Sequence, residues 1–176
     1  MPSILSHPAP ILALATLVPQ RLRTRRIVLA AVGCSVLPDV DVAGFAFGIP
    51  YGHVLGHRGI THGLPFALAL GAVVAAGLAQ ASGERFVPLW LFLTAATASH
   101  GCLDAMTNGG LGVAFLAPFS NRRWFFPVRP IEVSPIGLDR FLSPRGVAVL
   151  ASELRVVWLP SAMVAATALA LRRRTA

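Results

Sequence analysis

The feature that most constrains this chain is an apolar run of eighteen residues, at positions 64–81, that contains no charged side chain. As an α-helix, a run of this length extends about 27 Å, which is close to the thickness of the hydrocarbon core of a bilayer. A second long run covers residues 147–171, and its two charged residues, Glu153 and Arg155, are interpreted as a pair on the helix. Both runs predict helices that cross a membrane.

The composition agrees with a membrane protein. Hydrophobic residues make up 55% of the 176 residues and charged residues 12%, with a mean hydropathy of +0.70, far from an ordinary soluble domain. Shorter apolar segments at residues 10–18, 27–37 and 86–98 bring the number to five. The first two are too short to span unaided, so they extend into flanking residues or form a short hairpin against the longer helices. We expect one all-α integral membrane domain over residues 1–176, with about five hydrophobic helices.

The net charge of +8 comes from arginine alone, since the chain has no lysine. Arginines cluster at residues 21–26 and 172–174, beside apolar segments, which is typical of cytoplasmic membrane flanks and favours membrane lipid over nucleic acid as the partner. With both clusters in the cytoplasm, the chain crosses five times and every polar motif lies at the extracytoplasmic end. Five further arginines in residues 107–145 argue against this orientation. That segment is rich in glycine and proline, so we expect an irregular loop there.

Ionisable side chains near the ends of the apolar segments need a partner or a function. His100 and Asp104 are four residues apart and therefore share one face of a helix, where they could simply bond to each other. In the stretch LPDVD, residues 37–41, we expect Pro38 to end the preceding helix and an extended backbone to aim Asp39 and Asp41 the same way. Two such carboxylates repel each other unless a cation lies between them. The alternative role for either aspartate is a helix N-cap.

The stretch GHRGITHG, residues 56–63, contains two histidines five residues apart. On a straight helix this spacing separates His57 from His62 by about 140°, because each residue turns about 100°. The two can converge only if the backbone between them bends, and the three glycines of the stretch permit that. A lone histidine on an apolar face is more often a hydrogen-bonded core residue than a ligand. Four histidines and three aspartates gathered at one membrane face favour a metal site.

A mixture of imidazole and carboxylate ligands suits zinc or manganese, and the shortage of thiolates argues against a structural cysteine-type zinc site. Seven candidates exceed the needs of one four-coordinate ion, so we expect one to three divalent ions. Asp39 or Asp41 could also act as a general base. Arg58 could neutralise a substrate phosphate or hold Asp39 in place, and His53 is expected outside the site. The candidate ligands are His7, Asp39, Asp41, His57, His62, His100 and Asp104.

Several of these stretches together resemble the YdjM-like family of membrane-bound, metal-dependent hydrolases of the bacterial inner membrane. They are His7, LPDVD at 37–41, HRGITH at 57–62, SHGCLDAMTNGG at 99–110 and PFSNRRW from residue 118, and they cover about the first 130 residues. That family is distantly similar to the zinc-dependent phospholipase C and single-strand nuclease superfamily. The resemblance implies phosphoester hydrolysis at a zinc cluster, with His100 and Asp104 matching a ligand pair of that superfamily. The free N-terminal ligand of the secreted enzymes has no counterpart here, except that His7 could replace it.

Two functions follow as hypotheses. The first is a membrane-bound hydrolase that cleaves a phosphoester of a phospholipid or lipid-linked phosphate, because a site at the bilayer edge meets such headgroups by position. The second is a membrane metal-binding or transport protein without turnover, in which the same residues line an ion path. Residues at one end of the helices favour the hydrolase, and residues at the midplane favour transport.

Overall fold

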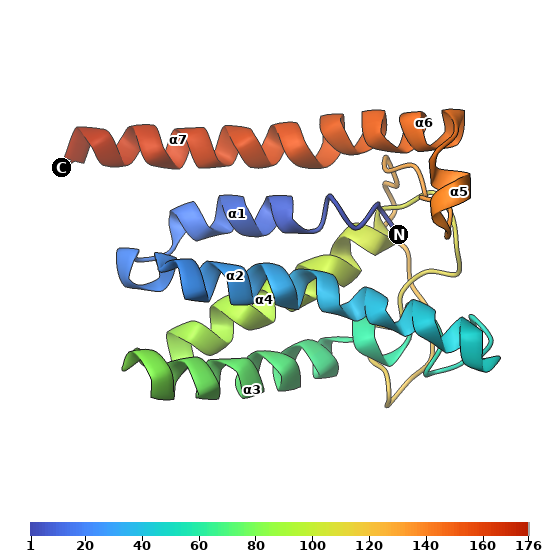
Figure 1. Cartoon of the computed structure of the whole chain (residues 1–176), viewed down its shortest axis with the longest axis horizontal. Coiled ribbons are helices and arrows are strands. Elements are labelled where there is room, and N and C mark those ends of the chain that lie inside the picture. The colour runs from blue at the N-terminus through green and yellow to red at the C-terminus, as the bar shows by residue number, and fades with distance from the viewer. Residues whose placement is uncertain (176) are drawn as a thin grey trace.

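The computed structural model describes residues 1–175, except for the side chains of Leu138 and Thr175. Within these residues every regular element is a helix, and strand-like pairing is limited to two isolated bridges. The helices run back and forth along the long axis of the molecule (Figure 1). The predicted all-α class is therefore confirmed. The elements are α1 Pro8–Leu17, η1 Gln20–Arg23, α2 Arg25–Val36, η2 Leu37–Phe47, η3 Ile60–His62, α3 Leu64–Ser82, α4 Phe86–Ala105, α5 Leu138–Phe141, α6 Pro144–Glu153, η4 Leu154–Trp158 and α7 Leu159–Thr175.

Four helical stretches of the described chain are long and apolar enough to cross a membrane, and α1 is a shorter apolar helix. This confirms the expected set of about five hydrophobic helices. The fourth stretch joins α6, η4 and α7 into one continuous helix. Residues 106–137 contain no helix, as the glycine and proline content predicted, but the expected loop of residues 107–145 is too long, since α5 and the start of α6 lie in its last part. The four stretches are Arg25–Phe47, Leu64–Ser82, Phe86–Ala105 and Pro144–Arg174.

The second predicted segment is longer than its apolar core because helix continues through Pro38. We expected Pro38 to end the helix and an extended backbone to follow, and that expectation is wrong. Pro38 lies in the first turn of the 3₁₀ helix η2, where a missing backbone N–H costs little. The chain stays helical to Phe47, and the helix is terminated by Gly48, whose φ of 72° is left-handed. Both aspartates of LPDVD are consequently on a helix.

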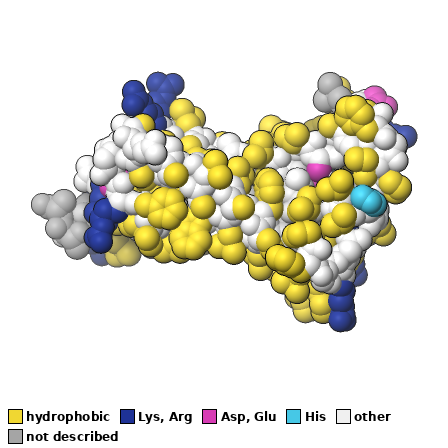
Figure 2. Space-filling view, turned by 90° about the horizontal axis from the view of Figure 1, so that it is seen from below, with side chains coloured by type: hydrophobic (Ala, Val, Ile, Leu, Met, Phe, Trp, Pro, Cys, Tyr) yellow, Lys and Arg dark blue, Asp and Glu magenta, His cyan; other side chains and the backbone are white. Residues whose placement is uncertain are grey.

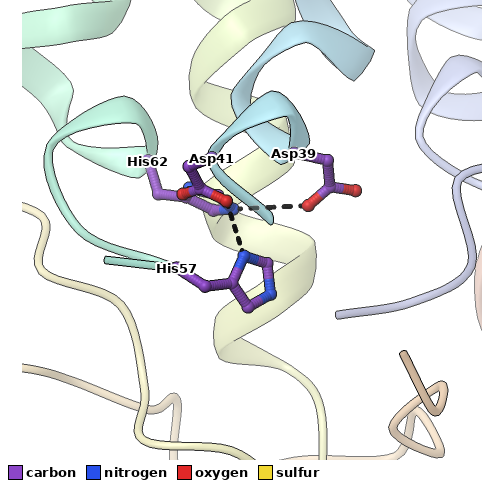
Figure 3. A group of neighbouring side chains, drawn as sticks. All are labelled: Asp39, Asp41, His57 and His62. Atoms are coloured by element: carbon purple, nitrogen blue, oxygen red, sulfur yellow. Dashed lines mark hydrogen bonds and ion pairs between the residues drawn. The ribbon is translucent and has the colours of Figure 1, made fainter. Parts of the chain in front are cut away.

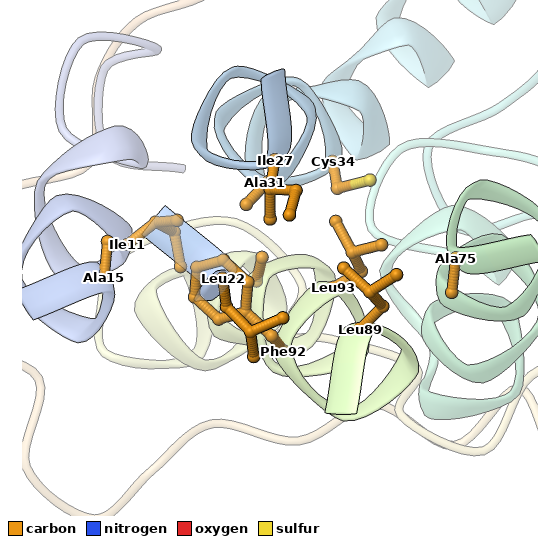
Figure 4. Packing of buried hydrophobic residues seen from close by; sticks show 11 residues of the cluster. Ile11, Ala15, Leu22, Ile27, Ala31, Cys34, Ala75, Leu89, Phe92 and Leu93 are labelled. Atoms are coloured by element: carbon orange, nitrogen blue, oxygen red, sulfur yellow. The ribbon is translucent and has the colours of Figure 1, made fainter. Parts of the chain in front are cut away.

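The helices pack around a small aliphatic core (Figure 4). Ile11 of α1, Ile27 of α2 and Leu93 of α4 are fully or almost fully buried there. Helices α3 and α4 approach closely at Gly71, where a Cβ atom would lie 2.4 Å from the hydroxyl of Thr94. Small residues at such crossings are typical of membrane helices, whose association depends on close packing.

The helix ends gather at two opposite ends of the molecule, because α1, α3 and α7 run one way and α2 and α4 the other (Figure 1). At one end Arg172 of α7 donates to the carbonyl of Val18, next to η1, so the two predicted arginine clusters share this end. At the other end lie the start of α1, the start of α3 and the end of α4. Between the two ends, the face drawn in Figure 2 is largely hydrophobic.

Candidate metal centre

A cluster of polar side chains lies where the start of α1, η2, η3 and the end of α4 meet, at the end of the molecule opposite the arginine clusters. Aspartates come from η2, histidines from the turn before α3, and a histidine and an aspartate from the last turns of α4. The structure brings together the seven predicted ligands there. Six of the seven residues are buried. Asp41 is half-buried when its backbone is included, but only 3% of its side chain is exposed. They are His7, Asp39, Asp41, His57, His62, His100 and Asp104.

Two overlapping sets of four residues could hold a metal ion. Within each set, one ligand atom from every residue lies within 4.8 Å of the others. Asp39 and His62 belong to both sets, and Figure 3 shows His62 between the two carboxylates of η2. Two ions could therefore lie side by side only by sharing these ligands. The first set is Asp39, Asp41, His57 and His62, and the second is Asp39, His62, His100 and Asp104.

The two histidines of GHRGITHG converge on one aspartate. His57 Nδ1 lies 2.7 Å from Asp41 Oδ1, and His62 Nδ1 lies 3.1 Å from Asp41 Oδ2. Their rings meet edge to face, with centroids 5.3 Å apart. The bend that the five-residue spacing requires is therefore present, and it ends in the short 3₁₀ helix η3.

The glycines of this turn are needed for close approach rather than for a left-handed backbone. A Cβ atom on Gly56 would lie 2.2 Å from the Pro50 carbonyl oxygen, and one on Gly59 would lie 2.1 Å from the Val54 carbonyl oxygen. Contacts that short do not occur between real side chains and backbone. The left-handed residue is instead Arg58, with a φ of 62°. In a non-glycine residue this conformation costs roughly 1–2 kcal/mol and is found most often at functional sites.

Asp39 and Asp41 do not point the same way, contrary to the expectation from an extended backbone. A 3₁₀ helix has three residues per turn, so positions two apart lie about 120° from each other around the axis. Asp41 faces His57 and also accepts from the Thr61 hydroxyl at 2.6 Å. Asp39 faces His100, whose Nε2 lies 3.2 Å from Asp39 Oδ1. The two carboxylates therefore lie next to different nitrogens of the His62 ring, Asp39 next to Nε2 and Asp41 next to Nδ1.

His100 is oriented by a backbone contact behind it. Its Nδ1 lies 2.7 Å from the carbonyl oxygen of Ser35, which can only accept, so Nδ1 carries the proton. Nε2 then faces the cluster, 3.0 Å from His62 Nε2. Metal-binding histidines are typically fixed in this way by a second hydrogen bond.

His7 lies beside the two sets rather than within them. Its ring is fully buried and stacks on His100 with centroids 3.7 Å apart, and its Nε2 is 3.9 Å from Asp39 Oδ2. Neither ring nitrogen has a hydrogen-bond partner among the described residues. Burial, and then the neighbouring His100, hold the pKa of His7 well below its usual value. The ring is consequently neutral at pH 7, the form that binds metals.

Arg58 holds Asp104 rather than Asp39. Its side chain is fully buried, and Nε lies 3.0 Å from Asp104 Oδ2. The remaining guanidinium nitrogens donate to the Gly109 carbonyl and the Thr107 hydroxyl, both at 3.0 Å. The predicted pairing with a carboxylate is therefore present with a different partner. Through it, the HRGITH turn and the end of α4 are tied together.

The charge balance of the cluster is negative and favours a cation. Burial works to lower the pKa of His62, but contacts with Asp104, Asp39 and Asp41 outweigh it and raise the pKa to about 10. Buried polar atoms without a hydrogen-bond partner within residues 1–175 include Asp39 Oδ2, Asp104 Oδ1 and both nitrogens of His7. Such atoms are rare in a folded protein and need an explanation. Their imidazole and carboxylate chemistry fits a divalent metal ion.

A second buried polar group is Glu153, and the expected pair with Arg155 is wrong, because positions two apart on a helix do not face each other. Glu153 is fully buried and accepts from the backbone N–H and hydroxyl of Ser3 and from the hydroxyl of Ser6. Trp158 Nε1 donates to the same Ser6 hydroxyl at 3.0 Å. Glu153 and Trp158 are five residues apart, and the π-helical turn η4 between them, which closes with a bond from Leu159 N–H to Leu154 O, brings them to one face. An acidic residue inside an apolar segment was the available signal.

Arginines of the irregular loop pack against this end of the molecule. Arg123 donates to the carbonyls of His57, Tyr51 and His53 at 3.0–3.1 Å. Arg122 lies over the Trp124 ring, 4.1 Å from its centroid. His53 itself is exposed and lies outside both sets, as expected. Arg123 thus ties the loop to the turn that carries His57.

Comparison with known proteins agrees with this architecture. The family model described as YdjM inner membrane protein matches residues 1–175. The inner membrane protein YbcI of Escherichia coli (strain K12) is 38% identical over 169 residues, which cover 93% of this chain and 95% of that protein. No solved structure gives a significant match. The family match and the apolar helices support a location in a bacterial inner membrane. Since the match extends over almost the whole length, the chain belongs to the YdjM family of inner membrane proteins.

Proposed function

We propose that the chain is a membrane-bound, metal-dependent hydrolase that cleaves a phosphoester of a lipid or lipid-linked phosphate. The observation that carries the proposal is the pair of overlapping four-residue sets that share Asp39 and His62. Two sites this close, with common ligands, match the arrangement of paired ions in phosphoester hydrolases. Zinc fits the donor set best, manganese also fits, and the sets favour two ions within the expected range of one to three.

Divalent ions bound there would supply a nucleophile from water at neutral pH and would neutralise developing negative charge. The chain's own residues hold this chemistry in place. Asp39 keeps Oδ2 available as a ligand or general base, while Asp41 fixes the orientation of His57 and His62. Arg58 positions Asp104 from behind the cluster. Placing the site on the extracytoplasmic side follows from the arginine clusters at the opposite end.

A non-catalytic metal-binding or transport role is the alternative, and one observation favours it. Asp39 and Asp41 lie inside Arg25–Phe47, a stretch apolar enough to cross the membrane. Carboxylates at such depth are found on ion paths as well as in enzymes. The two functions differ in whether the metal-loaded protein turns over a substrate.

Metal content of detergent-purified protein tests the ligand sets. His57 belongs only to the first set, His100 only to the second and His62 to both. We therefore expect His57→Ala and His100→Ala each to lower the number of bound zinc ions by about one, and His62→Ala to abolish high-affinity binding. His53→Ala is the matched control, since His53 is exposed and outside both sets, and it should bind as the wild type does. Equal metal content in all four variants would refute the assignment.

Hydrolysis is tested on the metal-loaded wild type with vesicles of defined phospholipids and with lipid-linked phosphates, following release of phosphate or headgroup. The proposal expects release from at least one substrate, abolished by chelation and by His62→Ala but retained in His53→Ala. Stoichiometric metal without release from any phosphoester would instead support the transport role, and zinc flux into proteoliposomes would then be the decisive measurement.

A further inference from the structure

The cluster is flanked by two cavities with largely apolar walls, one beside each carboxylate of η2. The first, of about 430 Å³, lies between the N-terminal segment, η2 and residues 134–137, and Asp39 lines it. The second, of about 380 Å³, lies between η2, the turn before η3 and the start of α3, and Asp41 lines it. Both volumes fall in the range of small-molecule binding sites. Either cavity is large enough to take part of a ligand.

The two carboxylates differ in what they can offer a ligand. Both oxygens of Asp41 are engaged, Oδ1 by His57 and Oδ2 by the Thr61 hydroxyl and the Arg58 N–H. Asp39 has an oxygen, Oδ2, without a hydrogen-bond partner among the described residues, although the residue is only 8% exposed. In Figure 3 one oxygen of this carboxylate is joined by a dashed line to His62, and the other points away from Asp41 and His57. Of the two cavities, the first is therefore the one lined by a carboxylate that keeps an oxygen without a hydrogen-bond partner.

The walls of the first cavity limit what could occupy it. Its apolar lining includes Val42 and Phe141, together with three side chains that are about half exposed, Ile4, Leu5 and Ile136. A soluble sugar or free phosphate would leave these walls without an apolar partner. A matching ligand has a hydrocarbon chain for the walls and an anionic head for an ion held by Asp39. In a membrane, amphiphiles of this kind surround the protein.

We infer that the cavity beside Asp39 binds the hydrocarbon chain of an amphiphilic phosphate, with the phosphate directed to the shared ligand Asp39. The inference rests on the proposed function, because it assigns the binding site of that substrate class. Straight-chain phospholipids and branched lipid-linked phosphates share this chemistry. The occupant is a lipid in either case, and the experiment below distinguishes a phospholipid from a lipid-linked phosphate.

Two valines of η2 allow a matched test. Val42 lines the first cavity and Val40 the second, so Val42→Trp and Val40→Trp introduce the same bulk two residues apart into different cavities. The zinc-loaded protein, kept in amphipol, is titrated with inorganic phosphate and with n-alkyl phosphonates of four to ten carbons, whose C–P bond resists hydrolysis. Decyl and geranyl phosphonate form the two arms that separate straight from branched chains.

In the wild type and in Val40→Trp we expect affinity to rise about fourfold with each added methylene, as burial of a CH₂ group predicts. In Val42→Trp the dependence on chain length should vanish, while zinc content and affinity for inorganic phosphate stay at the wild-type values. Equal chain-length dependence in Val42→Trp and Val40→Trp would overturn the inference, as would a wild type indifferent to chain length. Tighter binding of decyl phosphonate would identify the occupant as a phospholipid. Tighter binding of geranyl phosphonate would identify it as a lipid-linked phosphate.

The experiment can refute the lipid-binding site and the proposed hydrolase activity independently of each other. A chain-length profile that depends on Val42, in a protein that cleaves no phosphoester, would refute the proposed hydrolase and leave the lipid site standing. Hydrolysis of a phospholipid with the same chain-length profile in both tryptophan variants would refute the lipid site alone. Metal content, measured on each preparation, excludes loss of the metal cluster as the cause.

Discussion

The buried carboxylate of Glu153 makes a sharp prediction, because it connects the last membrane helix to the segment that carries His7. Glu153 accepts three hydrogen bonds, two from Ser3 and one from Ser6, and His7 follows directly in the chain. Replacing Glu153 by glutamine keeps the shape of the side chain and removes its charge. The variant therefore isolates the strength of these bonds from the packing around them.

The expected loss follows from the number of bonds. Hydrogen bonds to a charged group are roughly twice as strong as neutral ones, about 2 against about 1 kcal/mol in net stability. The amide oxygen can still accept from the Ser3 N–H, but both hydroxyls must reverse to accept from the amide nitrogen. With about 1 kcal/mol lost at each bond, Glu153→Gln should lower the free energy of unfolding by about 3 kcal/mol. Release of the desolvation cost of a buried charge acts in the opposite direction.

Thermal unfolding in detergent measures this difference. For a chain of this size, a loss of about 3 kcal/mol corresponds to a melting temperature lower by roughly 6–12 °C. Glu132→Gln is the matched control, since Glu132 pairs with Arg145 at 2.8 Å with both side chains about a third to half exposed. Such exposed pairs contribute about 0–1 kcal/mol. A Glu153→Gln protein at least as stable as Glu132→Gln would refute the reasoning, because the desolvation cost would then outweigh the three bonds.

Three further predictions concern the metal cluster and its orientation. Gly56→Ala should destabilise the protein by about 3 kcal/mol and lower its zinc content, because a Cβ there meets a carbonyl oxygen at 2.2 Å; Gly77→Ala, with nothing within 4 Å, should be neutral or stabilising in the same melting and metal assays. Zinc at about 100 times its dissociation constant should add about 2.7 kcal/mol to wild-type stability and nothing to His62→Ala, with reversal by chelation. In a background without native cysteines, an impermeant maleimide should label Val128→Cys in intact cells and Glu84→Cys after permeabilisation, and the opposite pattern would invert the topology.

Elements whose signal is local were predictable from the sequence. The lengths of the apolar runs at residues 64–81 and 147–171 alone predicted membrane-spanning helices. The four-residue spacing of His100 and Asp104 predicted that both lie on one helix, and both lie in the last turns of α4, which ends at Ala105. The bend in GHRGITHG followed from the geometry of a five-residue spacing. These inferences needed no knowledge of how segments pack, and the helices and the bend are confirmed.

Features that depend on contacts between distant segments were not predictable in the same way. Pro38 could end a helix or begin one, and only the packing of η2 against its neighbours decides which. Arg58 has two carboxylates nearer along the chain, Asp39 and Asp41, yet it pairs with Asp104, 46 positions later. Glu153 finds its partners about 150 positions earlier. Sequence spacing carries no information about such pairs.

The depth of the cluster connects the proposed function to the lipid site. From Arg25 to Asp39 the helix rises roughly 21 Å, at 1.5 Å per residue, and from Phe86 to His100 the rise is the same. With the arginine-rich end at one boundary of a hydrocarbon core about 30 Å thick, these ligands lie roughly 9 Å inside the other boundary. At that depth, roughly 6 Å beyond the midplane of the same core, a lipid headgroup does not reach the cluster from its resting position. A lipid substrate of the proposed hydrolase would therefore have to be drawn inward, and the apolar cavity beside Asp39 would receive its chain.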